Sequence, residues 1–284
     1  VPTPLHLEAA RPFLEAGRAV LIEKPLAANL EEAEEILRIA KRSGSTLQVG
    51  HIERFNPVLA AALPHVHDPL FIECDRIHPF SLRSTDVSVV LDLMIHDIDL
   101  ILQLIQDDLE EVDAVGASVI STTEDLATAR LVFRGGASAL VKTSRVAFSR
   151  SRKIRIFCHR AYLSLDLVNR SGTRIGVAEG YDPSSFLDDA GRISAPEGEA
   201  AFLARFLHTE QLVIPSYEPL RAELEAFLRA VREGTPALVT GAQGLRAMAT
   251  ARRIEERILH HRERVASRPH GGAGEHCPLE ENPT

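Results

Sequence analysis

The first part of the chain combines two kinds of apolar spacing. Residues 18–24 form a short apolar run, which is typical of a strand buried on both faces of a parallel sheet. Apolar residues then recur at helical spacing between Asn29, a predicted N-cap with Glu32 three residues later, and Gly44, a predicted C-terminal stop. Residues 46–51 form a second apolar run. Strand, helix and strand in this order predict a right-handed βαβ unit.

The chain before this unit predicts a helix over residues 3–17, interrupted by Pro12. A loop and a helix that lead into a βαβ unit are typical of the back half of a doubly wound fold. The sequence contains no Gly-x-Gly-x-x-Gly, and neither Gly135-Gly136 nor Gly271-Gly272 stands between a strand and a helix. Because an initiator methionine is also missing, we interpret the chain as a fragment or an incomplete reading frame that lacks the phosphate-binding turn.

From about residue 68 the pattern changes to short strand-like runs. The runs cover residues 70–76, 128–133, 137–146, 153–158 and 162–168. Tight turns at 134–136 and at 159–160 join neighbouring runs, which predicts an antiparallel meander and therefore a second domain. Helical periodicity returns over residues 218–231 and 241–261.

The segment from Val90 to Ile105 carries four polar side chains at helical spacing. On a helix, Asp92, His96, Asp99 and Gln103 would form one narrow stripe on a surface that is otherwise apolar nearly all round. Buried ionisable groups are costly unless they are paired or used. The stripe therefore indicates a histidine acid/base oriented by carboxylates, or else a hydrogen-bonded core network. Asp-x3-His-x2-Asp is too sparse to predict a metal site, and we expect none.

A second polar group stands where the first predicted strand ends. Glu23-Lys24-Pro25 follows the apolar run, and ligands bind at the carboxyl ends of the strands in open α/β sheets. Desolvation or a nearby cation lowers the proton affinity of a lysine at such a place. Most lysines at strand ends are merely solvated, so Lys24 indicates a functional site only together with the polar stripe.

Composition and charge exclude several classes of protein. Apolar residues make up 45% of the 284 residues and charged residues 25%, as in ordinary globular proteins. The formal net charge of −8 and the lack of a long basic run argue against a nucleic-acid partner. No apolar run spans a membrane and no signal peptide begins the chain, so we expect no membrane partner. Three widely spaced cysteines favour a reducing cytoplasm.

Four motifs in fixed order give a resemblance to a known family. They are Pro2-Thr-Pro-Leu-His6, Ile22-Glu-Lys-Pro25, Gly50-His-Ile-Glu-Arg-Phe-Asn-Pro57 and Asp92-x3-His96-x2-Asp99. Over about residues 1–262 the chain resembles the glucose–fructose oxidoreductase and inositol dehydrogenase family, Gfo/Idh/MocA. The resemblance implies an α/β fold: the C-terminal part of a Rossmann domain over residues 1–52, then an α+β domain with a large, mainly antiparallel sheet over 53–265. We expect residues 266–284 to be a disordered tail.

The resemblance also implies the chemistry, which is hydride transfer from a sugar carbon to C4 of a nicotinamide, with NAD as cofactor and NADP not excluded. His96 or Lys24 would accept the hydroxyl proton, with Asp92 beside them. The nicotinamide ribose end would contact Thr3, Pro4, His6, Glu23 and Lys24. The family's usual glycine is replaced by Met94, which we expect to narrow the pocket. Without the glycine-rich turn, the chain as given is expected to bind NAD weakly and to be inactive.

Within the family, the residues of the third and fourth motifs resemble those of a branch of enzymes. These enzymes oxidise the 3-hydroxyl of UDP-N-acetylglucosamine on the way to modified lipid A. We expect Arg54, Arg76 and Arg83 to bind a diphosphate, and Asn56 to bind an amide or hydroxyl of the substrate. Asp99 is also expected at the substrate. Each arginine is equally consistent with an ordinary surface charge. A dehydrogenase of a free sugar or polyol such as an inositol, and a catalytically inactive ligand-binding protein, stay as alternatives. We expect a homo-oligomer formed through the sheet of the second domain.

Overall fold

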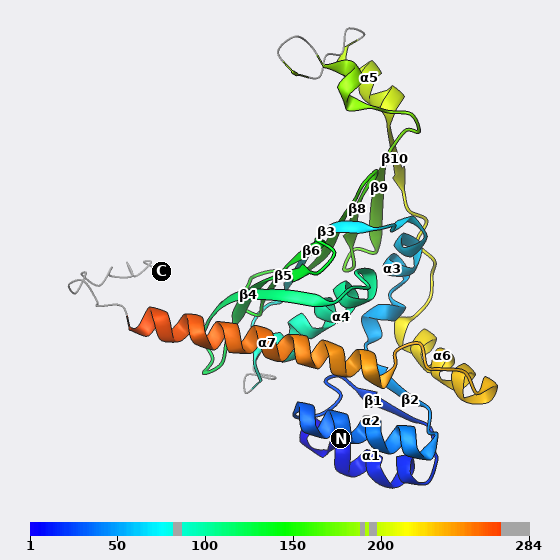
Figure 1. Ribbon diagram of the computed structural model, residues 1–284, viewed down its shortest axis with the longest axis vertical. Helices are drawn as coiled ribbons and strands as arrows, with labels where there is room; N and C mark the ends of the chain where they lie inside the picture. Colours follow the sequence, from blue (N-terminus) through cyan, green and yellow to red (C-terminus); the bar gives the residue numbers. More distant parts are fainter. Residues whose placement is uncertain (82–86, 188–190, 193–197, 268–284) are drawn as a thin grey trace, which may run out of the picture.

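The computed structural model describes residues 1–81, 87–187, 191–192 and 198–267. Two sheets organise this part of the chain, a two-stranded sheet near the N-terminus and an eight-stranded sheet beyond it. Figure 1 shows the small sheet at one end of the molecule and α5 (Glu199–Phe206) at the opposite end. From residue 268 on, the predicted tail lies outside the described residues.

The small sheet is the predicted βαβ unit. Strand β1 (Val20–Glu23) pairs in parallel with β2 (Leu47–Gly50), and α2 (Leu30–Ser43) connects them. The predicted caps are confirmed: the Asn29 side chain accepts a hydrogen bond from the Glu32 amide at 2.8 Å, and Gly44 adopts a left-handed conformation at the C-terminus. The alignment of β1 with β2 brings their carboxyl ends, Glu23 and Gly50, side by side.

Two features of this layer differ from the sequence-based expectation. A short 3-10 turn, η1 (Thr3–Leu5), leads into α1 (His6–Glu15), which continues through Pro12, so the predicted interruption is wrong. A proline removes one backbone donor, and the buried face of α1, with Ala10 and Leu14, compensates for that loss. In strand β1 only Ile22 is buried, because β2 is the sole neighbour of β1 among the described strands.

The large sheet confirms the predicted mainly antiparallel second layer. Its strands, in the spatial order β10-β9-β8-β7-β3-β6-β5-β4, are antiparallel except for the parallel pair β3 and β6. The strands are β3 (Pro69–Ile77), β4 (Leu109–Ala117), β5 (Leu126–Phe133), β6 (Ser138–Ser144), β7 (Ser151–Cys158), β8 (Ala161–Asp166), β9 (Ser171–Val177) and β10 (Leu207–Gln211). The predicted tight turns join β5 to β6 and β7 to β8. Strands β4, β9 and β10 were not expected from the sequence.

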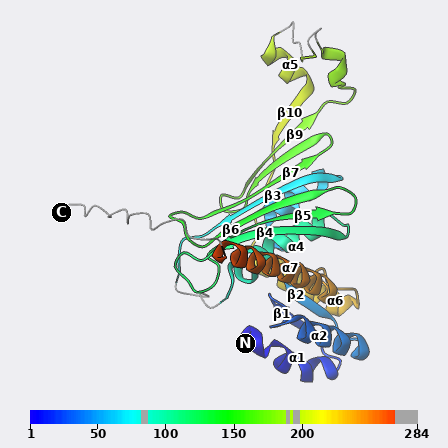
Figure 2. The same cartoon turned by 60° about the vertical axis from the view of Figure 1, so that its left-hand side comes forward.

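Helices and short turns cover one face of the large sheet, as the two views in Figures 1 and 2 show. They are η2 (Ile52–Phe55), α3 (Pro57–Ala62), η3 (Leu63–His65), the π turn η4 (Val90–Met94), α4 (Ile95–Leu104) and α7 (Gly241–Ala266). Helix α6 (Pro219–Glu233) packs against η2 instead. A further turn, η5 (Pro183–Phe186), lies with α5 beyond β9 and β10. The core forms between this face and the helices, with α4 almost wholly buried. Helix α7 begins at a Thr240–Gln243 capping box and runs five residues beyond the predicted end at His261.

Candidate active site

Lys24 leaves the carboxyl end of β1 and points at the start of the helical segment that carries the polar stripe. Its Nζ donates a hydrogen bond to the carbonyl oxygen of Asp92 at 2.5 Å and lies 3.5 Å from Asp92 Oδ1. Burial lowers the pKa of Lys24, while the Asp92 carboxylate acts in the opposite direction. The structure therefore joins two residues 68 positions apart into a partly buried ion pair at the junction of the two sheets.

The predicted polar stripe divides between two environments. Residues Val90–Met94 form a π turn, so the rotation of 100° per residue expected for an α-helix does not hold across them. Asp92 faces Lys24, whereas Asp99 is buried and its two oxygens accept hydrogen bonds from Arg54, both at 2.7 Å. Met94 is fully buried in the core, so its side chain does not narrow a pocket as predicted.

His96 is half-buried on α4 among cationic neighbours. Its Nδ1 is buried and has no hydrogen-bond partner in the described part of the chain. Burial, followed by the charges of Arg76 and Lys24, holds the pKa of His96 well below its usual value. A neutral imidazole at neutral pH is the form that accepts a proton, so this environment prepares His96 to act as a base.

His51, within the motif Gly50–Pro57, is a further candidate site residue for which the sequence alone indicated no role. It follows β2 and is buried, and within the described chain neither ring nitrogen has a hydrogen-bond partner. Its Nδ1 lies 3.8 Å from Asp99 Oδ2, and its charge acts on His96. Burial lowers the pKa of His51. Its position at the carboxyl end of β2 was the available signal, the same one that singled out Lys24 on β1.

Two arginines predicted for a diphosphate are held by buried carboxylates. Arg54 binds Asp99 as described, and Arg76 binds Asp97 through two hydrogen bonds of 2.8 Å. Arg76 also donates to Glu53 Oε1 at 3.0 Å. Because charge-assisted pairs of this kind occupy the guanidinium fork, both arginines have most of their donors engaged within the protein. This geometry favours the alternative of a core network for Asp99. Arg54 and Arg76 are buried, so neither is the ordinary surface charge that was the alternative for the arginines.

The other predicted substrate residues have different surroundings. Asn56 is buried as the N-cap of α3, where its Oδ1 accepts from the Val58 amide at 3.0 Å and its Nδ2 donates to Glu53 at 3.1 Å. Arg83 lies outside the described residues. The chain that continues from that region is held at Val87, whose carbonyl oxygen accepts a hydrogen bond of 2.8 Å from Arg145.

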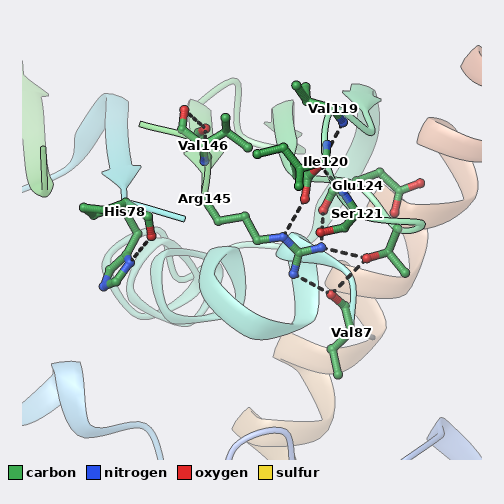
Figure 3. A network of polar contacts seen from close by, with 12 residues as sticks. His78, Val87, Val119, Ile120, Ser121, Glu124, Arg145 and Val146 are labelled. Atoms are coloured by element: carbon green, nitrogen blue, oxygen red, sulfur yellow. Dashed lines mark hydrogen bonds and ion pairs between the residues drawn. The ribbon is translucent and has the colours of Figure 1, made fainter. Parts of the chain in front are cut away.

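Figure 3 shows how Arg145 fixes the approach to the π turn. From the end of β6, its guanidinium donates to Asp125, to the carbonyl oxygens of Val87 and Glu124 and to the Thr123 hydroxyl. Asp125 in turn accepts three backbone amides, from Val119, Ile120 and Ser121. This buried network positions the residues directly before η4 and so the backbone that presents Asp92 to Lys24.

The residues predicted to contact a coenzyme gather at the carboxyl edge of the small sheet. Thr3 is half-exposed and Pro4 exposed in η1, and Glu23 is exposed at the end of β1. His6 is buried, and its Nδ1 lies 3.1 Å from the carbonyl oxygen of Pro25 and 3.3 Å from that of Leu26. His6 therefore holds the turn that follows Lys24.

Glu223 on α6 is a buried carboxyl group close to this edge. It is 1% exposed, and its Oε1 has no hydrogen-bond partner in the described chain. Burial and the nearby Glu23 carboxylate raise the pKa of Glu223 to about 7. A carboxyl group whose pKa is raised in the folded state stabilises the fold below its unfolded pKa, and this stabilisation is lost as the pH rises towards 7.

We expect Glu223→Gln to remove this pH dependence. The free energy of unfolding of the variant minus that of the parent should be about 2–3 kcal/mol larger at pH 8 than at pH 5, so the variant gains stability over the parent as the pH rises. Urea unfolding at the two pH values measures the difference. Glu225→Gln, at an exposed position of the same helix, is the matched control and should show no such change. An equal effect of Glu223→Gln at both pH values would contradict the assignment.

The described residues contain neither a metal-binding cluster nor a membrane-spanning helix. No group of three or more histidine, cysteine, aspartate or glutamate side chains in the described ranges is arranged to hold a metal ion. Among the helices that the structure describes, none has both the length and the apolar character needed to cross a membrane.

The fold and the site together define a class of protein, a two-domain oxidoreductase with a dinucleotide-binding domain. Residues 1–51 match the profile of the oxidoreductase family with an NAD-binding Rossmann fold, and residues 75–164 match the GFO/IDH/MocA C-terminal domain. The UDP-N-acetylglucosamine 3-dehydrogenase of Acidithiobacillus ferrooxidans is 32% identical over 89% of this chain and 75% of its own length. The chain therefore belongs to the Gfo/Idh/MocA family of oxidoreductases.

Structural similarity agrees with this assignment. The crystal structure of the Acidithiobacillus ferrooxidans enzyme has a TM-score of 0.79 at 30% identity, over 92% of this chain and 77% of that one. A more distant relative, the myo-inositol 2-dehydrogenase of Thermotoga maritima, is 26% identical over 90% of this chain and 76% of its own length. The family thus includes relatives named for a nucleotide-linked sugar and for a free polyol.

The edge of the small sheet fits one end of the coenzyme. The exposed Glu23 carboxylate and the Thr3 hydroxyl are suitable partners for ribose hydroxyls. A Cβ atom on Gly50 would lie 2.6 Å from Glu23 Oε2, so glycine leaves the space that this carboxylate occupies. The glycine-rich turn that binds the pyrophosphate is not part of the sequence. The residues present are therefore chemically suited to a ribose of the coenzyme.

Proposed function

We propose that this protein is an NAD-dependent sugar dehydrogenase that oxidises a ring hydroxyl to a ketone, and that its substrate is UDP-N-acetylglucosamine, oxidised at the 3-hydroxyl. The observation that carries the proposal is the convergence of Lys24, Asp92 and His96 at the carboxyl end of β1, with His96 neutral. Similarity over most of the chain to an enzyme named for that substrate supports the choice of sugar.

Oxidation of an alcohol removes one proton from oxygen and one hydride from carbon. In the proposed reaction the hydroxyl proton moves to His96, and the carbon–oxygen single bond becomes a carbonyl. NAD, when bound, supplies the hydride acceptor at its nicotinamide ring. His96 accepts the proton readily because burial and cationic neighbours keep its imidazole neutral.

Lys24 stabilises the negative charge that develops on the reacting oxygen. Its ammonium group is partly buried, so its interaction with an oxyanion is weakly screened. Asp92 holds the ammonium through its backbone oxygen and its carboxylate. The Asp92 interaction therefore orients Lys24 before substrate arrives, which reduces the reorganisation needed during the reaction.

A free polyol is the second candidate substrate. Lys24, Asp92 and His96 require only a hydroxyl beside a transferable hydrogen, and Arg54 and Arg76 are engaged with Asp99 and Asp97 rather than free for a diphosphate. The similarity to an inositol dehydrogenase supports the same reading. The choice between the two depends on whether another cation at the site binds phosphate.

We expect UDP-N-acetylglucosamine to support NADH formation, and myo-inositol or free glucose to do so far more slowly. A phosphate held by two arginine hydrogen bonds favours the nucleotide sugar by roughly two orders of magnitude or more. NADH formation is measured with a panel of UDP-sugars, hexoses and inositols, in a form extended before Val1 by a strand and a Gly-x-Gly-x-x-Gly turn. Faster turnover of any unphosphorylated polyol would overturn the choice of substrate.

A further inference from the structure

Arg152 is a cation at the site that lies outside the four sequence motifs. It lies on β7 directly opposite Arg76 of β3, and residues paired across antiparallel strands project from the same face. On the same strand, Ile154 and Ile156 are buried, while Lys153 on the other face is exposed. Arg152 therefore points to the face covered by helices, where Lys24 and His96 lie.

One carboxylate connects the two arginines. Glu53 Oε1 accepts a hydrogen bond of 3.0 Å from Nη1 of Arg76 and another of 3.0 Å from Nη1 of Arg152. Arg76 is buried and bound on both sides of its guanidinium, because Asp97 takes its remaining donors. Arg152 differs, since its side chain is 33% exposed and, within the described chain, its Nε and Nη2 donate no hydrogen bond.

A second cation stands two residues earlier. Arg150 is exposed, and its Nη2 lies 2.7 Å from Nε2 of His78, a ring nitrogen that brings no negative charge. Arg150 and Arg152 thus present positive charge at one end of β7, and the Glu53 carboxylate that binds Arg152 is shared with Arg76. Free guanidinium donors in a planar fork match the geometry of phosphate oxygens.

We propose that Arg152, assisted by Arg150, is the subsite for the diphosphate of a nucleotide-linked sugar. The inference rests on the proposed function and extends it, because it assigns the phosphate contact to residues other than Arg54 and Arg76. Burial and the neighbouring Arg76 lower the pKa of Arg152, which means that nearby negative charge does not fully offset these two effects in the free protein. Arg152 is also among the cations that lower the pKa of His96.

The test measures binding of UDP and of uridine to the 284-residue chain by titration calorimetry, without coenzyme or turnover. Arg152→Gln should weaken UDP binding ~10- to 100-fold and leave uridine binding unchanged, because only UDP carries phosphate. Arg150→Gln should have a smaller effect in the same direction. Arg155→Gln is the matched control, since Arg155 lies on the opposite face of β7 and pairs with Glu73 and Asp75.

A second variant separates binding from folding. Arg152→Lys keeps the positive charge near Glu53 but loses the planar fork, so its UDP affinity should fall between those of the parent and Arg152→Gln. Equal UDP affinity in the parent and Arg152→Gln would overturn the subsite and leave the proposed dehydrogenase intact. An equal loss of UDP and uridine binding would assign Arg152 a structural role. Absence of UDP binding by the parent chain would overturn both the subsite and the nucleotide-sugar substrate.

Discussion

Replacing His96 by asparagine or Lys24 by alanine is expected to reduce turnover on the order of 10²–10⁴-fold, far more than either change alters coenzyme affinity. Asparagine keeps a polar side chain at position 96 but cannot accept the hydroxyl proton. Alanine at position 24 removes the ammonium group that stabilises the developing charge. The measurement is kcat at saturating substrate in the form extended before Val1, together with NAD affinity by fluorescence.

The pH profile gives an independent measure of the same assignment. Because the pKa of His96 lies well below 6.5, activity should persist into mildly acidic solution and decline only when His96 becomes protonated. His208→Asn, at an exposed position on β10, is the matched control and should keep the parent's profile. Near-normal turnover in both His96→Asn and Lys24→Ala would reduce the polar residues of η4 and α4 to a structural network.

Arg76→Met is expected to destabilise the fold by about 3–5 kcal/mol, because it leaves the buried Asp97 carboxylate without its partner. Asp97 is 2% exposed, and both of its oxygens bind Arg76. Burial raises the pKa of Asp97 even with Arg76 present, so loss of the cation leaves an uncompensated charge. Equilibrium unfolding in urea at neutral pH measures the effect.

The double variant Arg76→Met, Asp97→Leu should recover much of that loss, because it replaces both members of the pair by apolar side chains. Arg155→Met serves as the control. Its carboxylate partners, Glu73 and Asp75, are about one-third exposed, so its cost should stay below about 1 kcal/mol. An equal loss in the free energy of unfolding for Arg76→Met and Arg155→Met would show that the buried network contributes no more to stability than a surface ion pair.

Features specified by neighbouring residues could be predicted from the sequence. The Asn29 cap, the Gly44 stop and the turn at 134–136 each depend on the local backbone preferences of a few residues, and the structure has all three. Strand β4 was missed because its exposed positions carry charged residues such as Glu111 and Asp113. They hide the alternation of buried Val112 and Ala114.

Pairing across the fold could not be predicted in the same way. The stripe on η4 and α4 assumed an uninterrupted α-helix, and local propensities do not indicate the π turn that separates Asp92 from Asp99. Asp97 lay outside the stripe, yet it binds Arg76 at a sequence separation of 21 residues. Strand register decides which arginine has nearly all its donors bound to carboxylates and which keeps donors available, and register is fixed only when the whole sheet forms.

The cations around His96 have a thermodynamic consequence. Arg76, Lys24, His51 and Arg152 all disfavour a proton on His96 in the free protein. An anion that binds among them must increase the proton affinity of His96, and by reciprocity protonation of His96 must tighten anion binding by the same factor. Occupancy of the site and readiness of its base are thus coupled. Binding of an anionic substrate would raise the pKa of His96 towards neutral pH. Loss of the anion would lower this pKa again and favour release of the proton to solvent.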